Sequence, residues 1–183
     1  MLNVYQVRPS IEDNKPDFDS WVPGNPTGED YDATRYAREG NASTAEYFPL
    51  HFRIIHDDVQ KWDFYEMGGP KLLSQRAGEL LRPYLGPCLS LLPCTLNDVD
   101  WWTFRWEGSI DCLIHEESEL RYFNPANRSR VMDFEKLAFD HTLLHDPQLF
   151  LVPEIARTIF ATEGVKTLIE EKGLKGFRFI PVE

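Results

Sequence analysis

The sequence predicts an α+β fold with a mainly antiparallel or mixed sheet and a few short packed helices. Short strand-like runs outnumber helical ones and occur in groups, as at 101–106 and 110–114. Two other segments, about 74–84 and 162–173, show helical spacing of apolar residues between recognisable caps. With 183 residues, of which 42% are hydrophobic, the chain is long enough for one domain with its own core.

The N-terminal region begins as a strand and continues as an arm. Residues 2–8 alternate loosely between apolar and polar side chains, which predicts a first strand. From Pro9 to Pro49 the chain carries five prolines, several glycines and many acids. We therefore predict a single 1–183 domain in which residues 1–50 form a Pro-rich, loop-like arm. Aromatic side chains are spread through the arm, and we expect them to hold it against the body.

The middle of the chain contains short strands around one helix. Pro83 is expected to end or kink the helix that starts after Ser74, because proline removes a backbone donor. Apolar and aromatic runs predict strands at 51–55, 62–66, 89–92, 101–106, 110–114 and 122–124.

The segment before the last helix is less regular. Residues 131–139 fit either a strand or a short helix, and residues 149–152 form an apolar, strand-like run. Pro153 suits the first position of a short helix over 153–157, because its missing N–H is not needed there.

The end of the chain contains the clearest helix–strand unit. Thr162 is the predicted N-cap of an amphipathic helix, and Gly173 is placed to end it in a left-handed conformation. Residues 177–182 then alternate as a closing strand.

The same pattern occurs 88 positions earlier in the chain. Ser74–Leu81 aligns with Thr162–Ile169, and Leu89–Pro93 aligns with Phe177–Pro181. Two interpretations remain open: any two capped helix–strand units look alike, or the domain consists of two pseudo-repeated helix–strand halves.

Charge and cysteine content limit the functions that fit. The formal net charge of −11 disfavours nucleic-acid binding, since phosphates attract Lys and Arg. It favours a basic partner, or it simply keeps an ordinary acidic protein soluble. The N-terminus lacks the pattern of a secretory signal, and no window approaches the roughly 20 apolar residues of a membrane span. Cys88, Cys94 and Cys112 have no metal-ligand spacing, which predicts reduced thiols in the cytoplasm.

Two residue pairs have the spacing of a reactive site. His141 and His145 would share one face of a helix and could bind zinc, which leaves a metal-dependent hydrolase as an alternative function. A zinc protease, however, needs a glutamate where Thr142 stands. Cys112 and His115 could form a thiol–imidazole pair, but the acids beside them disfavour a thiolate. Lacking a phosphate-binding glycine loop or a nucleophilic-serine motif, the sequence predicts no enzyme, no metal and no cofactor.

The stretch 97–120 combines acids with tryptophans. It carries seven acids against Arg105 alone, with three tryptophans interleaved. Interfaces concentrate tryptophan, and a charge field of one sign steers an oppositely charged partner. Alternatively, the tryptophans alternate into the core and the acids face solvent. The predicted partner-binding residues are Asp98, Asp100, Trp101, Trp102, Glu116, Glu117 and Glu119.

Three blocks of the sequence carry a family resemblance. They are residues 159–182, residues 73–81, and a middle block in which Asp111 on a predicted strand precedes Glu117-Ser118-Glu119. Together they resemble the signatures of immunity protein family eleven, a family of bacterial proteins that guard against polymorphic contact-dependent toxins. The resemblance covers about residues 62–182 and leaves the Pro-rich arm outside it.

The resemblance implies a cytoplasmic immunity protein that binds a cognate bacterial toxin and occludes its active surface, with no chemistry of its own. Toxin-binding positions vary in that family, so no binding residue is carried over. We expect the toxin to present a basic surface, and neither nucleic acid nor membrane is an expected partner. Besides the hydrolase, a regulatory protein-binding module without a toxin partner remains an alternative.

Overall fold

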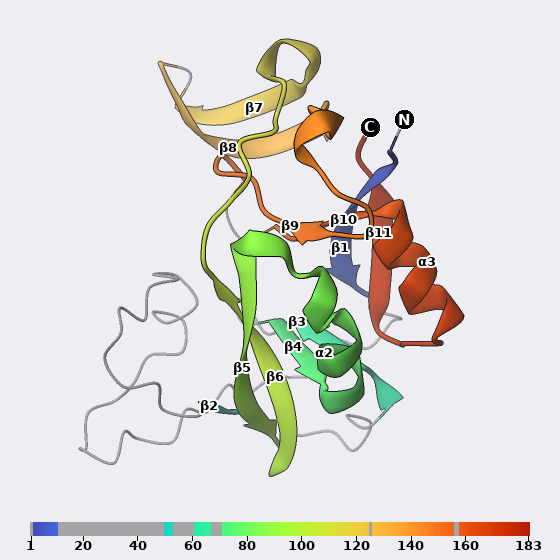
Figure 1. The fold of residues 1–183 in the computed structure, drawn as a ribbon. Coiled ribbons are helices and arrows are strands. Elements are labelled where there is room, and N and C mark those ends of the chain that lie inside the picture. The colour runs from blue at the N-terminus through green and yellow to red at the C-terminus, as the bar shows by residue number, and fades with distance from the viewer. Residues whose placement is uncertain (1, 11–49, 53–60, 67–70, 125, 156–157) are drawn as a thin grey trace, which may run out of the picture.

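The computed structural model describes residues 2–10, 50–52, 61–66, 71–124, 126–155 and 158–183. These residues form a five-stranded sheet, a four-stranded sheet and a separate two-stranded hairpin, together with two short α-helices (Figure 1). The arm predicted for residues 1–50 lies outside the described residues except at its two ends.

The five-stranded sheet has the order β2-β5-β6-β4-β3. Its strands are β2 (Leu50–Phe52), β3 (Phe64–Glu66), β4 (Lys71–Ser74), β5 (Leu89–Leu96) and β6 (Val99–Trp106). Every pair in this sheet is antiparallel except β2–β5. Helix α2 (Gln75–Leu81) follows β4 and gives way to a 3-10 turn that contains Pro83, as the proline predicted.

The four-stranded sheet has the order β11-β1-β10-β9 and is antiparallel throughout. Its strands are β1 (Val4–Pro9), β9 (Leu149–Phe150), β10 (Phe160–Thr162) and β11 (Phe177–Pro181). Helix α3 (Glu163–Glu171) connects β10 to β11. The hairpin consists of β7 (Glu119–Asn124) and β8 (Asn127–Lys136). The predicted α+β fold with mainly antiparallel strands is confirmed.

The two sheets repeat one arrangement. In the first, β3 pairs with β4, helix α2 leads to β5, and β6 lies antiparallel between β4 and β5. In the second, β9, β10, α3 and β11 take the same places, and the N-terminal strand β1 occupies the position of β6. The helix–strand repeat seen in the sequence therefore corresponds to two halves of one topology, whose central strands come from different parts of the chain.

At the start of each helix, the hydroxyl group of the N-cap residue donates a hydrogen bond to an aspartate. Ser74 donates its hydroxyl to Asp63 at 2.6 Å and accepts a first-turn N–H at 3.1 Å, so it caps α2. Thr162 has the N-cap position of α3, but its hydroxyl donates to Asp146 at 2.7 Å and makes no capping bond. Asp146 accepts the Gly164 N–H at 2.8 Å instead. The predicted capping role of Thr162 thus belongs to Asp146, because a carboxylate binds a free helix N–H more strongly.

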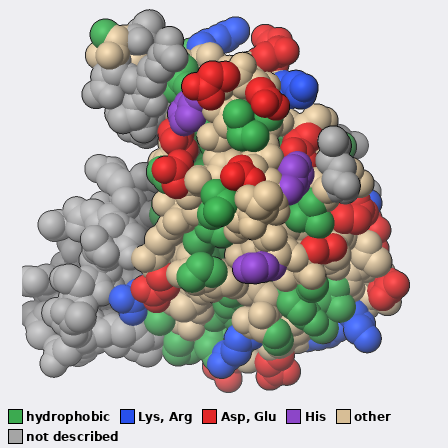
Figure 2. Space-filling view, turned by 45° about the horizontal axis from the view of Figure 1, so that its top comes forward, with side chains coloured by type: hydrophobic (Ala, Val, Ile, Leu, Met, Phe, Trp, Pro, Cys, Tyr) green, Lys and Arg blue, Asp and Glu red, His purple; other side chains and the backbone are tan. Residues whose placement is uncertain are grey.

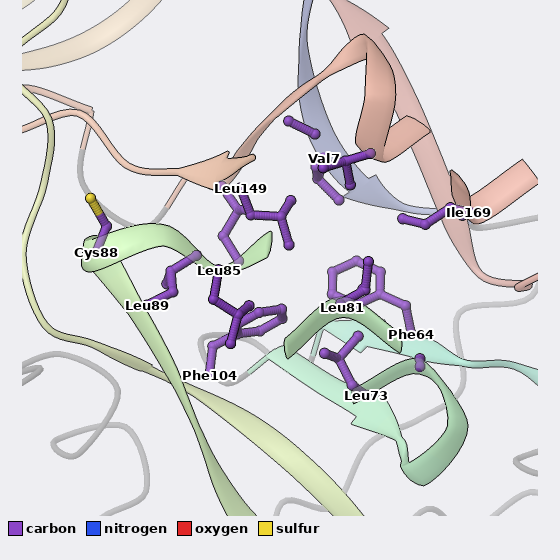
Figure 3. Packing of buried hydrophobic residues seen from close by; sticks show 14 of the residues in the cluster. Val7, Phe64, Leu73, Leu81, Leu85, Cys88, Leu89, Phe104, Leu149 and Ile169 are labelled. Carbon is purple, nitrogen blue, oxygen red and sulfur yellow. The ribbon is translucent and has the colours of Figure 1, made fainter. Parts of the chain in front are cut away.

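Both helices pack into one hydrophobic core between the sheets (Figure 3). Ala77 and Leu81 of α2 align in the repeat with Val165 and Ile169 of α3, and all four are almost fully buried. A second cluster surrounds the ring of Phe160 and extends under the β7–β8 hairpin, where its members include Leu120, Tyr122, Val131 and Phe134.

Two local predictions are wrong. Residues 110–114 form no strand, and only Leu113 makes an isolated bridge, because the Ile110 and Ile114 N–H groups bond to separate carbonyls elsewhere. Residues 153–155 form a turn instead of opening a helix, since the Glu154 carbonyl accepts the Val131 N–H. Residues 131–139 fitted either a strand or a short helix, and in the structure residues 131–136 belong to a strand that ends at Lys136.

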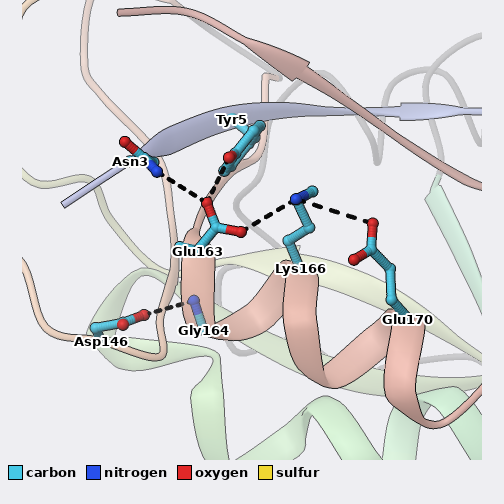
Figure 4. A network of polar contacts seen from close by, with 7 residues as sticks. All are labelled: Asn3, Tyr5, Asp146, Glu163, Gly164, Lys166 and Glu170. Atoms are coloured by element: carbon cyan, nitrogen blue, oxygen red, sulfur yellow. Dashed lines mark hydrogen bonds and ion pairs between the residues drawn. The ribbon is translucent and has the colours of Figure 1, made fainter.

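Glu163 joins the start of α3 to β1 (Figure 4). Its carboxylate accepts hydrogen bonds from the Tyr5 hydroxyl, from the Asn3 amide at 3.1 Å and from Lys166 Nζ at 3.1 Å. These bonds, that of Tyr5 foremost, lower the pKa of Glu163 from 4.5 to about 2. The ionised carboxylate is therefore the form that the folded protein favours.

We expect Glu163→Gln to remove part of the sensitivity of the fold to acid. A carboxyl group whose folded-state pKa is depressed stabilises the fold above its unfolded pKa, and this stability is lost as pH falls from 4.5 to about 2. The urea midpoint of the variant should lie below that of the wild type near neutral pH, and the two should converge near pH 2. Because 35% of the side chain is exposed, solvent screening keeps the difference small. A difference independent of pH would contradict this role.

Candidate protein-binding surfaces

The tip of the β5–β6 hairpin carries the first group of predicted residues. Asn97 and Asp98 form its two-residue turn with φ angles of 49° and 63°, the conformation that matches the twist of paired strands. Val99 is 47% exposed and lies between the exposed Asp98 and Asp100. The tip thus presents one apolar side chain flanked by two carboxylates.

The two predicted tryptophans follow this tip on opposite faces of β6. Trp101 is 5% exposed and packs its ring against Tyr65. It therefore points into the core, as the alternative interpretation of the tryptophans predicts. Trp102 is half-buried against α2, where Arg82 stacks 4.6 Å above its ring and Gly78 leaves room for the indole. Trp101 thus has almost no exposed surface for a partner to contact, and only part of the Trp102 side chain is exposed.

The second group of predicted residues lies near the base of the β7–β8 hairpin. Glu116 and Glu117 belong to a 3-10 turn (His115–Glu117), Glu119 begins β7, and all three are exposed. Figure 1 places this hairpin at the opposite end of the molecule from the β5–β6 tip. The predicted residues therefore form two separate surfaces. Figure 2 shows acidic side chains dispersed over the face that bears the hairpin, with exposed apolar groups between them.

The β7–β8 hairpin has an irregular register. The register shifts three times, and the pairing passes over Glu135, Met132 and residues 128–130 of β8 and over Phe123 of β7. Met132 is 48% exposed and Phe123, on β7, is 60% exposed. Bulges of this kind redirect side chains. Neither residue could be singled out from the sequence, because register shifts leave no clear trace in apolar periodicity.

A hollow of about 240 Å³ lies on this hairpin. It is lined by Glu119, Leu120, Arg121, Asp133, Phe134 and Glu135. Leu120 and Phe134 are directly paired across the strands, and the charged side chains surround them. Glu119 is the one predicted site residue among them.

The base of the hairpin is fixed by a polar cluster. The two ring nitrogens of His115 lie 2.9 Å from the Tyr122 hydroxyl and 3.0 Å from Glu154 Oε1. Ser118 adds hydrogen bonds on either side, to the Ile114 carbonyl and from the Ala138 N–H. His115 is thus a tether between β7 and the loop after β9.

Neither the Cys112–His115 pair nor the His141–His145 pair has the geometry or the ionisation that its candidate chemistry needs. Cys112 is buried, which raises its pKa to about 12, the opposite of what a nucleophilic thiolate needs. His141 lies in a 3-10 turn and its Nε2 is 3.0 Å from Glu183 Oε1, so it does not share a helix face with His145. In the described ranges, no three His, Cys, Asp or Glu side chains are grouped to hold a metal ion.

No family model matches this chain, and no curated protein matches it either. Within the described residues, none of the helices combines the length and apolar character needed to cross a membrane.

Proposed function

We propose that this chain is a cytoplasmic immunity protein that binds a cognate bacterial toxin and neutralises it by occluding its active surface. The three sequence blocks that resemble immunity protein family eleven support the class of function. The observation that carries the proposal is the β7–β8 hairpin, which lies outside both sheets and holds Phe123 and Met132 in solvent.

A hairpin that only covered the core would need apolar side chains on its inner face alone. Leu120, Tyr122, Val131 and Phe134 already serve that purpose against the second cluster. Phe123 and Met132 add exposed apolar area beside carboxylates, the composition of an interface with a charged rim.

The charge of the chain supports a basic partner. The net charge is −11, and the exposed acids of both candidate surfaces would attract a positively charged protein and speed its association. A toxin that acts on nucleic acid would fit this description, since it needs a basic surface for phosphate.

We expect that reversing Asp98, Asp100, Glu116 and Glu117 to lysine weakens binding at least tenfold, which is about 1.4 kcal/mol. The ligand is the protein encoded immediately upstream of this chain's gene, and calorimetric titration gives the affinity. Because the two surfaces lie at opposite ends, the Asp98/Asp100 and Glu116/Glu117 pairs should also be reversed separately to show which end makes contact.

The control matched in charge to each separately reversed pair is Glu79→Lys with Glu171→Lys, two exposed acids on the helices, which should bind like the wild type. Unchanged affinity in the folded quadruple variant would place the interface elsewhere. An upstream gene that encodes no secreted effector would favour the regulatory binding module instead.

A further inference from the structure

We infer that the hollow on the β7–β8 hairpin receives an arginine side chain of the partner protein. This inference rests on the proposed function and specifies the chemistry of its contact. At about 240 Å³ the hollow is smaller than the roughly 300–1,000 Å³ of sites that enclose a small molecule. Its size instead suits a single side chain that enters from another protein surface.

Among the described residues, the charged side chains around the hollow are not neutralised by one another. Glu119, Asp133 and Glu135 line it together with one basic residue, Arg121. Within the described part of the chain, Glu119, Arg121 and Glu135 form no ion pair, and Asp133 accepts only the N–H of Phe134. Three carboxylates against one guanidinium leave a negative balance that an incoming cation would neutralise.

The apolar lining favours arginine over lysine. Leu120 and Phe134 are only partly buried against the second cluster, so their remaining exposed area lines the hollow and offers an apolar surface to the stem of a long side chain. The planar guanidinium can stack on the ring of Phe134 and bind a carboxylate through two parallel hydrogen bonds. An ammonium group is more strongly hydrated and has no planar face for stacking.

The irregular strand gives the hollow its third acid. Glu135 occupies a register shift between Phe134 and Lys136, where a regular strand would set each residue against a partner. The bulge places this carboxylate at the hollow beside Asp133.

The hollow is preorganised from beneath. His115 binds both Tyr122 of β7 and Glu154 of the body, which fixes the strand that carries Glu119 and Arg121. The strand therefore needs little further ordering when a partner binds, and a preformed site of this kind loses less affinity to conformational entropy.

The test uses two double variants. The hollow variant combines Glu119→Gln and Glu135→Gln, and the matched control combines Glu79→Gln and Glu171→Gln. Both remove two exposed carboxylates, but only the first changes the hollow. With the protein encoded immediately upstream as the probe, the hollow variant should bind at least tenfold more weakly and the control within about twofold of the wild type.

A second variant gives a result that misfolding cannot mimic. Arg121→Gln removes the one basic group at the hollow and should tighten binding about threefold or more. Weaker binding of Arg121→Gln, or wild-type affinity of the hollow variant, would overturn the inference and leave the proposed function standing. If the wild type does not bind the probe at all, the proposed function fails and the inference fails with it.

Discussion

Phe160→Ala should lower the free energy of unfolding by about 3–5 kcal/mol. Phe160 is fully buried at the centre of the second core cluster. Its ring is stacked 5.6 Å from that of Phe150 and meets Phe139 at the same distance, nearly edge to face. Its backbone also lies in β10, between β1 and β9, so the surrounding strands cannot collapse readily into the cavity.

Urea denaturation followed by circular dichroism measures this loss. The matched control is Phe123→Ala, because Phe123 is 60% exposed and its truncation should change stability by no more than about 0.5 kcal/mol. Equal losses in the two variants would show that the second cluster is not the packed core described above.

Gly176→Ala is expected to cost about 3 kcal/mol, because two effects add at this position. Gly176 has a φ of +93°, where a side chain strains the backbone. A Cβ there would also lie 2.5 Å from the Phe64 carbonyl oxygen, on β3 of the other half. The neighbouring Lys175 carbonyl accepts the Asp63 N–H, so the backbone cannot move away without breaking the junction of the two halves.

Gly173→Ala separates the two effects. Gly173 also has a positive φ, +61°, but no atom lies within 4 Å of its Cβ position. Its substitution should therefore cost only the backbone term, about 1 kcal/mol. Similar losses for the two variants in thermal or urea unfolding would mean that the contact between Gly176 and Phe64 does not hold the halves together.

The bounds of both helices could be predicted from the sequence. The helix that starts after Ser74 and its early end at Pro83 follow from capping and from the missing proline N–H. The left-handed stop at Gly173 follows in the same way. Even the equivalence of Ala77 with Val165 could be seen in the repeat, since both lie on the buried face of their helix.

Long-range pairing could not be predicted in this way. β1 pairs with β10 and β11, which lie more than 150 residues away, and nothing in its own six residues selects those partners over β6 or β5. Asp146 likewise caps α3 from a loop that only the folded sheet brings near. Both depend on contacts that local periodicity does not encode.

The candidate surfaces were predictable only in part. The exposure of Asp98 and of Glu116 follows from their charge, but their separation onto two ends of the molecule depends on the path of the chain between β6 and β7. The burial of Trp101 was one of two outcomes allowed by strand alternation. The hollow lies where the register between β7 and β8 shifts, which side-chain pattern alone does not reveal.

In the function proposed above, this chain acts by covering another protein and not by chemistry. The most direct measurement follows the residual activity of the upstream-encoded effector while purified chain is added in increasing molar ratio. Occlusion predicts a linear fall to an end point at a fixed stoichiometric ratio, unchanged by longer incubation. Protection by a small fraction of one equivalent that grows with time, or full effector activity in the presence of excess chain, would contradict the account.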